Sequence, residues 1–429
     1  MTSIATASPA ISSRLGSRAA IDVPRRDGAR LALGAAVVAV VALPLVAPRG
    51  PANTSPSDLF LILAIAAVLL WATRVGHRWR FPYAFALALF MAGGALGAIV
   101  GPVPANGLIA LSQDLLLLAW CWALVNVASS PHRLRILLQT WAYSSVAWSL
   151  VLFAGLLGGS TALAGQTTRN AGRAALTFVD PNTAANYYVI SIMIICATQR
   201  PRRRSARLLA YGMLVGATFT TGSNSGAVSL ILAVSVTSLV SLYRRFGGTA
   251  AISGFAFIVL CGWLIATNVS LSSIEQKAHD SSYTFVREGV GRGQKSVSQR
   301  QMLLHESAHL YETGGLLGQG PVSTKTRLDA EMAPFVKEAH NDYFAALTER
   351  GLIGLFGLFL LLGGVALRAL SLLSSRIGPR YAAVVVRPGA LVGAVVGTMA
   401  TSAVYELLHV RHVWALFAIV AAIFVWGRE

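Results

Sequence analysis

Charged residues are scarce in this chain of 429 residues: Asp, Glu, Lys and Arg together make up 12% of it, and only four residues are lysine. A soluble domain usually carries about twice that charged fraction. Hydrophobic residues make up 55% of the chain, and the mean hydropathy is +0.62. Apolar runs long enough to cross a bilayer recur along the sequence, which predicts an all-α, polytopic membrane protein.

Cysteines and paired carboxylates are rare as well. The three cysteines, Cys121, Cys196 and Cys261, fall inside predicted membrane helices, with no spacing typical of a disulfide framework or a metal site. No Asp-x-Asp motif occurs, so the carboxylate pair that often holds a divalent metal is missing. We therefore expect no cofactor.

Twelve apolar segments predict twelve transmembrane helices. They divide the chain into a flexible cytoplasmic tail (1–30), spans one to nine (31–270), a large external loop (271–340) and spans ten to twelve (341–429). The tail has no apolar core, and no cleavable signal peptide is apparent. The predicted spans are 31–47, 58–73, 81–101, 107–128, 136–158, 181–198, 206–221, 225–243, 249–270, 342–367, 385–403 and 410–427.

The net charge of +18 is distributed unevenly between the two sides of the membrane. With both termini in the cytoplasm, most of the 35 basic residues fall in cytoplasmic segments such as QRPRRRSAR (199–207). This asymmetry follows the positive-inside rule and sets the predicted orientation. The basic excess is therefore a topology signal, and we expect no nucleic-acid partner.

The external loop 271–340 is longer than a connector between spans needs to be. Its middle, SVSQRQMLLHESAHLYE (296–312), predicts an amphipathic helix with an apolar stripe formed by Leu303, Leu304, Ala308 and Tyr311. The glycine-rich stretch GGLLGQGP (314–321) then ends the helix, because glycine permits backbone angles that other residues avoid.

Polar residues also stand at the start of the tenth span, in EAHNDYFAALTERGLIG (338–354). Asn341 is a good N-cap, and Asp342 in the first turn suits the helix dipole. Glu349 is expected about two turns into the membrane, where it needs a partner, and an arginine from another segment is our hypothesis. Capping does not explain His340; histidine is the side chain best suited to act as a general base near neutral pH. The sequence offers no role for Arg350.

A second external segment, GGSTALAGQTTRNAGRAALTFVDPNTAANYY (158–188), carries Arg169 and Arg173 ahead of Asp180-Pro181-Asn182. The two arginines are exceptions to the positive-inside rule, because they lie in an external segment. Guanidinium groups are suited to bind phosphate oxygens. Pro181 fits the first turn of the next helix with Asp180 as its N-cap. The alternative role of the Pro-Asn pair is therefore only to start this helix.

A third external cluster, VYELLHVRHVW (404–414), lies at the ends of the last two spans. Ionisable residues at that depth usually have partners or a function. The alternative is an interfacial belt together with Trp414. The ionisable residues of this cluster are Glu406, His409, Arg411 and His412.

The predicted loop helix contains a match to His-Glu-x-x-His at His305, Glu306 and His309. On a helix, two histidines four residues apart can share a zinc ion while the glutamate acts as a general base. The extended motif of one zinc peptidase class would need glycine at position 312, where Glu312 stands. A membrane zinc metallopeptidase is therefore an alternative function without an evident third ligand.

The ordered set of polar motifs resembles the core region of the O-antigen ligase and polymerase superfamily of membrane glycosyltransferases. The resemblance covers residues 170–427. Pro181-Asn182 is similar to the family's Pro-Asn element, and TGSNSGAVSLIL (221–232) takes the place of its Ser-Arg-Ser element, with Asn224 where the arginine is expected. The other matching elements are Ser298, Arg300, the turn 316–321, His340-Asn341, Glu349, Gly351-Leu352 and Gly354.

The resemblance implies transfer of a glycan from an undecaprenyl-diphosphate donor to a sugar hydroxyl of a glycan or glycolipid acceptor. It also implies a multi-pass protein of the bacterial inner membrane that acts on the external face. His340 would be the general base, and arginines would stabilise the leaving diphosphate. The candidate donor- or glycan-binding residues are Arg169, Arg173, Arg300, Asn182, Asn341, Glu349 and Arg411. The motifs do not separate a ligase from a polymerase.

A transporter of lipid-linked glycans is the remaining alternative. Transport without covalent chemistry would favour charged residues deep within the spans. Only Asp114 and the pair Glu349 and Arg350 are expected there, whereas most polar residues gather at the external face.

Overall fold

The computed structural model is all-helical over the residues that it describes, namely 25–49, 54–167, 172–268, 270–282, 287, 293–332, 340–374 and 377–428. Each of the twelve predicted spans coincides with one helix. Six of the helices are long and apolar enough to cross a membrane, and shorter apolar helices accompany them. The chain is therefore a multi-pass membrane protein, while the number of twelve spans stays a prediction.

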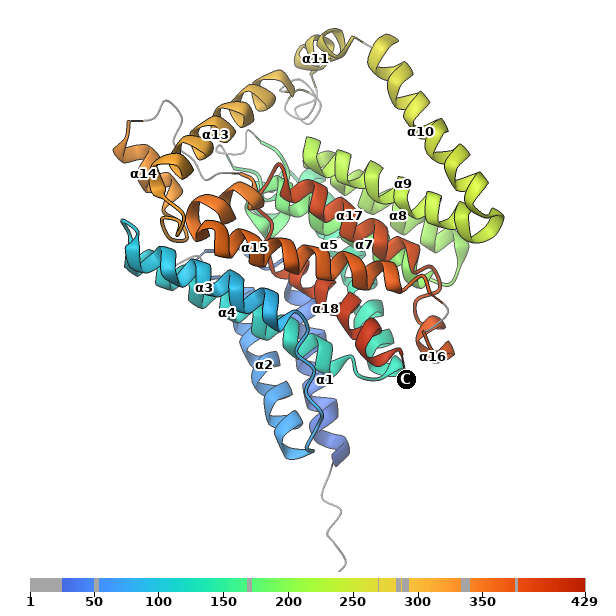
Figure 1. The fold of residues 1–429 in the computed structure, drawn as a ribbon. Coiled ribbons are helices and arrows are strands. Elements are labelled where there is room, and N and C mark those ends of the chain that lie inside the picture. The colour runs from blue at the N-terminus through green and yellow to red at the C-terminus, as the bar shows by residue number, and fades with distance from the viewer. Residues whose placement is uncertain are drawn as a thin grey trace, which may run out of the picture.

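The helices that match predicted spans form a bundle, and their bounds differ from the predicted ranges by several residues at some ends (Figure 1). They are α1 (Arg25–Ala42), α2 (Pro56–Arg74), α3 (Ala84–Val100), α4 (Pro104–Val127), α5 (Pro131–Leu157), α7 (Pro181–Thr198), α8 (Arg204–Thr220), α9 (Asn224–Phe246), α10 (Gly248–Asn268), α15 (Asp342–Ser371), α17 (Gly389–Ser402) and α18 (Arg411–Trp426).

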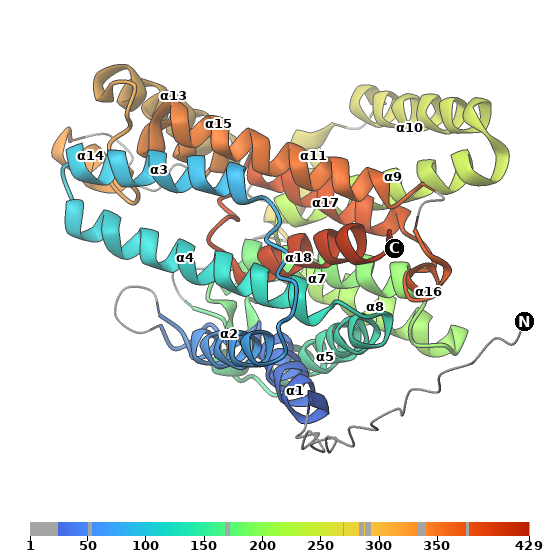
Figure 2. The same cartoon turned by 60° about the horizontal axis from the view of Figure 1, so that its bottom comes forward.

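The centre of the bundle is formed by α7 and α18, whose residues are almost all buried. Figure 2 shows α3 and α15 side by side along one flank, and small residues allow this close packing. A Cβ atom added at Gly93 of α3 would lie 2.4 Å from the backbone nitrogen of Gly354 of α15. Larger side chains at this contact would separate the two helices.

Shorter helices lie between α5 and α7 and in the 271–340 segment. The first are α6 (Thr161–Ala164) and the 3-10 turn η3 (Leu176–Phe178). In the large segment, α13 (Gly293–Gly314) and α14 (Thr324–Ala330) cross one end of the bundle, whereas α11 (Leu271–His279) lies away from the bundle beside the end of α10 (Figure 1). A further short helix, α16 (Pro379–Ala382), precedes α17. Helix α13 packs on α15 and buries Leu303, Ser307 and Leu310. The buried face of α13 is thus rotated from the predicted stripe, which shares only Leu303 with it.

Helix α10 stands apart from the bundle and contacts α9 (Figure 1). None of its most apolar 18-residue window is buried, and Trp263 on it is 60% exposed. A fully apolar helix with this exposure is stable only in lipid or against another apolar surface.

Candidate functional site

His340 lies directly before α15, at the end of the bundle that α13 and α14 cross. Its backbone has a φ of 48°, a left-handed conformation that is uncommon for residues other than glycine. The backbone nitrogen donates a hydrogen bond of 2.9 Å to Oε1 of Glu406. The imidazole stacks on the ring of Tyr405, with centroids 5.6 Å apart and planes 22° apart. His340 is thus fixed against the α17–α18 connection through its main chain and its ring.

Asn341, the residue before α15, also contacts the α17–α18 connection. Oδ1 of Asn341 accepts from the backbone nitrogens of Tyr343 and Phe344, so it is the predicted N-cap. Its Nδ2 also donates to the carbonyl of Ala403 at 2.8 Å. Asn341 thereby joins the start of α15 to the end of α17.

Asp342 is held by a different contact from the one expected. Its buried carboxylate accepts from the backbone nitrogens of Leu407 and Leu408, at 2.9 and 3.2 Å. These two amides belong to the connection between α17 and α18, so the aspartate joins this connection to the start of α15, in addition to facing the dipole of its own helix.

Tyr405 connects His340 to the start of α7. Its hydroxyl lies within hydrogen-bond reach of the side chains of Asp180 and Thr183. Burial first, and then the neighbouring Asp180 carboxylate, raise the pKa of Tyr405 well above its ordinary value, so the phenol stays protonated at neutral pH. Asp180 is the N-cap of α7, as predicted, and accepts from the backbone nitrogens of Asn182 and Thr183.

Arg173 lies on the other side of Asn182. Its Nε donates to the carbonyl of Thr221 at 2.7 Å, and its Nη2 lies 3.4 Å from Oδ1 of Asn182. The hydroxyl of Ser223 donates to the same Oδ1 at 2.8 Å. Arg173, Asn182 and the start of α9 therefore converge, and the segment 221–225 contributes serine hydroxyls at the place of the missing arginine.

Glu349 has partners other than the arginine we expected. Oε2 accepts from the backbone nitrogen of Val322 at 3.0 Å, and Oε1 accepts from the hydroxyl of Thr324 at 2.8 Å. The carbonyl of Glu349 also accepts from the backbone nitrogen of Gly320. Its carboxylate therefore fastens the segment before α14 to α15.

A kink in α15 exposes the backbone groups that make this connection. Gly351 has φ 62° and ψ −166° inside the helix, a conformation open to glycine alone. The freed carbonyl of Thr348 accepts from the nitrogen of Gln319, and the nitrogen of Leu352 donates to Leu316. Backbone hydrogen bonds thus hold the glycine-rich turn 315–321 against the kink.

Arg350, which the sequence left without a role, is paired inside the bundle. Its Nη2 lies 2.6 Å from Oδ2 of Asp114 on α4, and its guanidinium lies 3.9 Å from the ring centroid of Phe90 on α3. Both partners of the ion pair are buried. The arginine therefore joins α3, α4 and α15 beside the kink.

The third predicted cluster also contains structural contacts. Arg411 forms a two-point ion pair with Asp58 at the start of α2, at 2.7 and 2.5 Å. Nε2 of His412, fully buried, lies 3.0 Å from Oδ1 of Asn186. Asp58 therefore neutralises the charge of Arg411.

The side chains of two candidate arginines fall outside the described residues. Arg169 falls outside the described residues, and Arg300 lies on α13 with its side chain outside them. The side chains of His305 and His309 are exposed on the same helix. Within the described residues, no group of three His, Cys, Asp or Glu side chains is arranged to hold a metal ion.

Residues 209–359 match the family model described as O-antigen ligase (Wzy_C), which confirms the resemblance found in the motifs. The matched segment runs from α8 into α15 and includes Ser223, Arg300, His340 and Glu349, whereas Arg173 and Asn182 precede it. No curated protein matches the chain. The match supports a membrane glycosyltransferase-like function.

Proposed function

Because residues 209–359 match the O-antigen ligase family, we propose that the protein is a metal-independent membrane glycosyltransferase that uses an undecaprenyl-diphosphate donor. The acceptor is a sugar hydroxyl on a glycan or glycolipid, and the reaction takes place at the external face of a bacterial inner membrane. Both termini would then be cytoplasmic. Ligase and polymerase activities differ only in the acceptor.

One observation carries the proposal: residues from three distant segments meet at one end of the bundle. His340 stacks on Tyr405, Tyr405 reaches Asp180, and Asp180 caps the helix whose second residue, Asn182, contacts Arg173. A base and a phosphate-binding cation are thereby held by neighbouring, rigid helix ends, as a transfer reaction requires.

In the reaction, the acceptor oxygen forms a bond to the anomeric carbon of the donor sugar. The bond from that carbon to the diphosphate oxygen breaks, and its electron pair stays on the diphosphate. The acceptor proton passes to the imidazole of His340. Arg173 stabilises the charge that develops on the diphosphate, with Arg300 and Arg169 as further candidates. Asn341 and Tyr405 hold the geometry around the base.

The direct test supplies the purified protein with an undecaprenyl-diphosphate glycan and a set of candidate acceptors in the presence of EDTA. A longer glycan product together with released undecaprenyl diphosphate is the expected result. Glycan transfer that EDTA abolishes and zinc restores would contradict the metal-independent mechanism and support a zinc site at His305 and His309. Movement of the donor across the bilayer without a new glycosidic bond would support the transporter.

Replacing Arg173 with alanine is expected to reduce donor use by about tenfold or more, because a charge-assisted contact to phosphate is lost. Arg173→Lys should restore only part of the activity, since an ammonium group cannot reproduce the guanidinium contacts to Thr221 and Asn182. Initial rates at several donor concentrations measure the effect.

The matched control for Arg173 is Arg327→Ala, which removes an arginine that pairs with Glu331 on α14. This variant should keep near-normal donor use. Equal losses in the two variants would contradict a phosphate-binding role for Arg173.

Glu349 is expected to act through the turn that it holds. Glu349→Ala leaves the Val322 amide and the Thr324 hydroxyl without their acceptor, and the loss at the buried Thr324 costs about 1–3 kcal/mol. The α13–α14 segment should then become more sensitive to trypsin at Lys325 and Arg327, and transfer should fall. Glu349→Gln keeps one acceptor oxygen and should show a smaller change in both measurements.

Glu331→Ala is the control for Glu349, because it removes the carboxylate directly after α14, whose ion pair with Arg327 is about a third exposed. It should leave the cleavage rate and the transfer rate almost unchanged. A fall in transfer by Glu349→Gln with an unchanged cleavage rate would point to direct substrate binding by Glu349 instead.

A further inference from the structure

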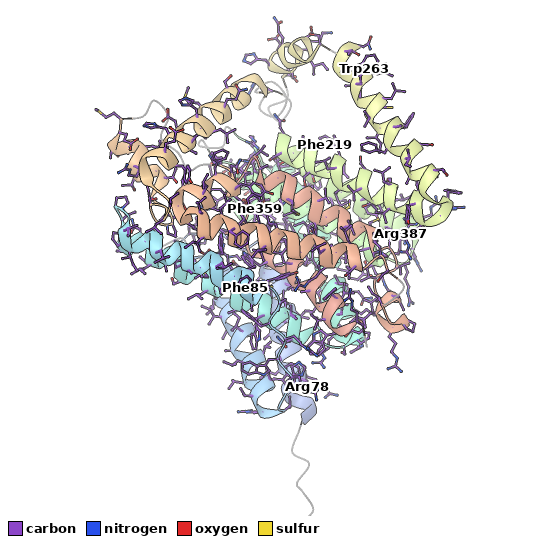
Figure 3. The ribbon with its side chains drawn as sticks, viewed as in Figure 1. Arg78, Phe85, Phe219, Trp263, Phe359 and Arg387 are labelled. Atoms are coloured by element: carbon purple, nitrogen blue, oxygen red, sulfur yellow. The ribbon has the colours of Figure 1, made fainter. Side chains whose placement is uncertain are left out.

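Acidic residues are missing from three long stretches of the sequence. None stands between Asp114 and Asp180, between Asp180 and Glu275, or between Glu349 and Glu406. These stretches contain the helix ends that lie opposite the candidate active site, and those ends are rich in arginine. Figure 3 shows Arg387 at this end, across the bundle from α13 and α14 of Figure 1.

Two neighbouring recesses open at this end of the bundle. The first has a volume of about 550 Å³, part of it open to solvent, and is lined by Arg135, Arg200 and Arg202. The second has a volume of about 710 Å³, also partly open to solvent, and is lined by Arg204, Arg207 and Arg387. Gln199 lines both recesses, so they adjoin each other.

Backbone contacts fix the walls of both recesses. Nη1 of Arg207 donates to the carbonyls of Gln199 and Pro201, at 3.1 and 3.2 Å. The backbone nitrogen of Arg387 donates to the carbonyl of Ala197 at 2.9 Å. These contacts join the α7–α8 loop to the start of α8, and the α16–α17 connection to the last turn of α7. The guanidinium of Arg207 and the backbone that carries Arg387 are therefore fixed at the walls of the second recess.

The cations of the recesses have no carboxylate to neutralise them in the described part of the chain. Elsewhere in the described residues, Arg350, Arg411 and Arg327 each form an ion pair with an acidic side chain. Neither recess has an acidic residue in its lining. Six guanidinium groups so close together repel one another, and a bound anion would relieve this repulsion.

The walls also carry apolar side chains next to the arginines. Leu138 and Val384 line the first recess, and Leu208 lines the second. A soluble phosphate would leave these surfaces without a partner, whereas the acyl chains of a lipid would cover them. Basic pockets at the ends of membrane helices bind anionic lipid head groups in this way.

We propose that the two recesses form a binding site for an anionic phospholipid with two phosphate groups, one phosphate seated in each recess. Guanidinium groups bind the phosphate oxygens, and the fatty acyl chains lie along α5 and α8. The site lies at the opposite end of the bundle from His340, so the proposal does not depend on the glycan transfer proposed above.

The experiment uses the full chain in nanodiscs of phosphatidylcholine with or without cardiolipin, a phospholipid with two phosphates. Bound lipid is counted by native mass spectrometry after release, and the melting temperature is measured in both lipids. We expect retained cardiolipin and a higher melting temperature with it. The double variants Arg200→Gln with Arg202→Gln, and Arg204→Gln with Arg387→Gln, should each weaken retention by about tenfold.

The matched control is Arg244→Gln with Arg245→Gln, which removes two exposed arginines from the last turn of α9 that line neither recess. It should retain cardiolipin like the unchanged protein. Equal losses in the control and the recess variants would overturn the proposal, because only overall charge would then matter.

Two further measurements distinguish lipid binding from a purely structural role of the arginines and from the binding of a soluble phosphate. Melting temperatures in phosphatidylcholine alone should match between the recess variants and the control, and a large fall confined to the recess variants would overturn the assignment by showing a purely structural role. Inorganic pyrophosphate added in lipid-free detergent should not raise the melting temperature. Stabilisation by pyrophosphate equal to that by cardiolipin would overturn the choice of a lipid.

Discussion

His340→Ala is expected to lower glycan transfer by at least about a hundredfold, which is the usual contribution of a positioned general base. The fold should survive, because the contact of His340 with Glu406 uses the backbone nitrogen, which alanine retains. The ring that is lost stacks on Tyr405 and caps no helix. Transfer from an undecaprenyl-diphosphate donor and the elution profile of the purified protein measure the two quantities.

His340→Asn is a second variant, chosen to keep the left-handed backbone conformation at position 340. Asparagine tolerates the left-handed conformation better than most residues, so the φ of 48° is kept with little strain. Its amide cannot accept a proton near neutral pH, and the activity should be as low as that of His340→Ala. Substantial activity in His340→Asn would reduce His340 to a positioning residue.

His305→Ala is the matched control, since it removes an exposed histidine from α13. It should transfer glycan at a near-normal rate. If His305→Ala is inactive while His340→Ala is active, zinc chemistry at His305, Glu306 and His309 replaces the mechanism proposed above.

The helices and their caps could be predicted from the sequence because local signals determine them. Each predicted span coincides with a helix, since a run of apolar residues of that length has no other stable form in a membrane. Asn341 and Asp180 cap the helices that they were expected to cap. In both cases the side chain and the backbone groups that it satisfies are at most three residues apart.

Contacts between distant segments could not be predicted in the same way. Arg350 lies 236 positions from its partner Asp114, and Arg411 lies 353 positions from Asp58. Asp114 stood out in the sequence as a charge within a span, but nothing local shows which cation it meets.

The same limit applies to the candidate site. Arg173 and Asn182 were singled out and do lie in contact, whereas Tyr405, the residue that joins them to His340, was not. Its only signal was its position next to Glu406 in a cluster of ionisable residues. Glu349 was expected to meet an arginine, but the kink at Gly351 places loop amides and a hydroxyl beside its carboxylate.

Arg350→Ala is expected to destabilise the protein by about 3–5 kcal/mol, because it leaves the buried Asp114 carboxylate without its cation. The cation over the ring of Phe90 is lost as well. Glu349 and Gly351 flank Arg350, so the turn that they hold should loosen and transfer should fall with stability. Melting temperature in mild detergent and transfer at low temperature measure the two effects.

The double variant Arg350→Met with Asp114→Leu distinguishes the effect of the two charges from the effect of the volume that their side chains fill. Replacing both charges with apolar groups of similar size removes the desolvation cost along with the attraction, and such exchanges are often neutral. The melting temperature of the double variant should therefore lie well above that of Arg350→Ala, and the trypsin sensitivity at Lys325 should return toward normal. If the double variant melts as low as Arg350→Ala, the guanidinium itself positions the kink.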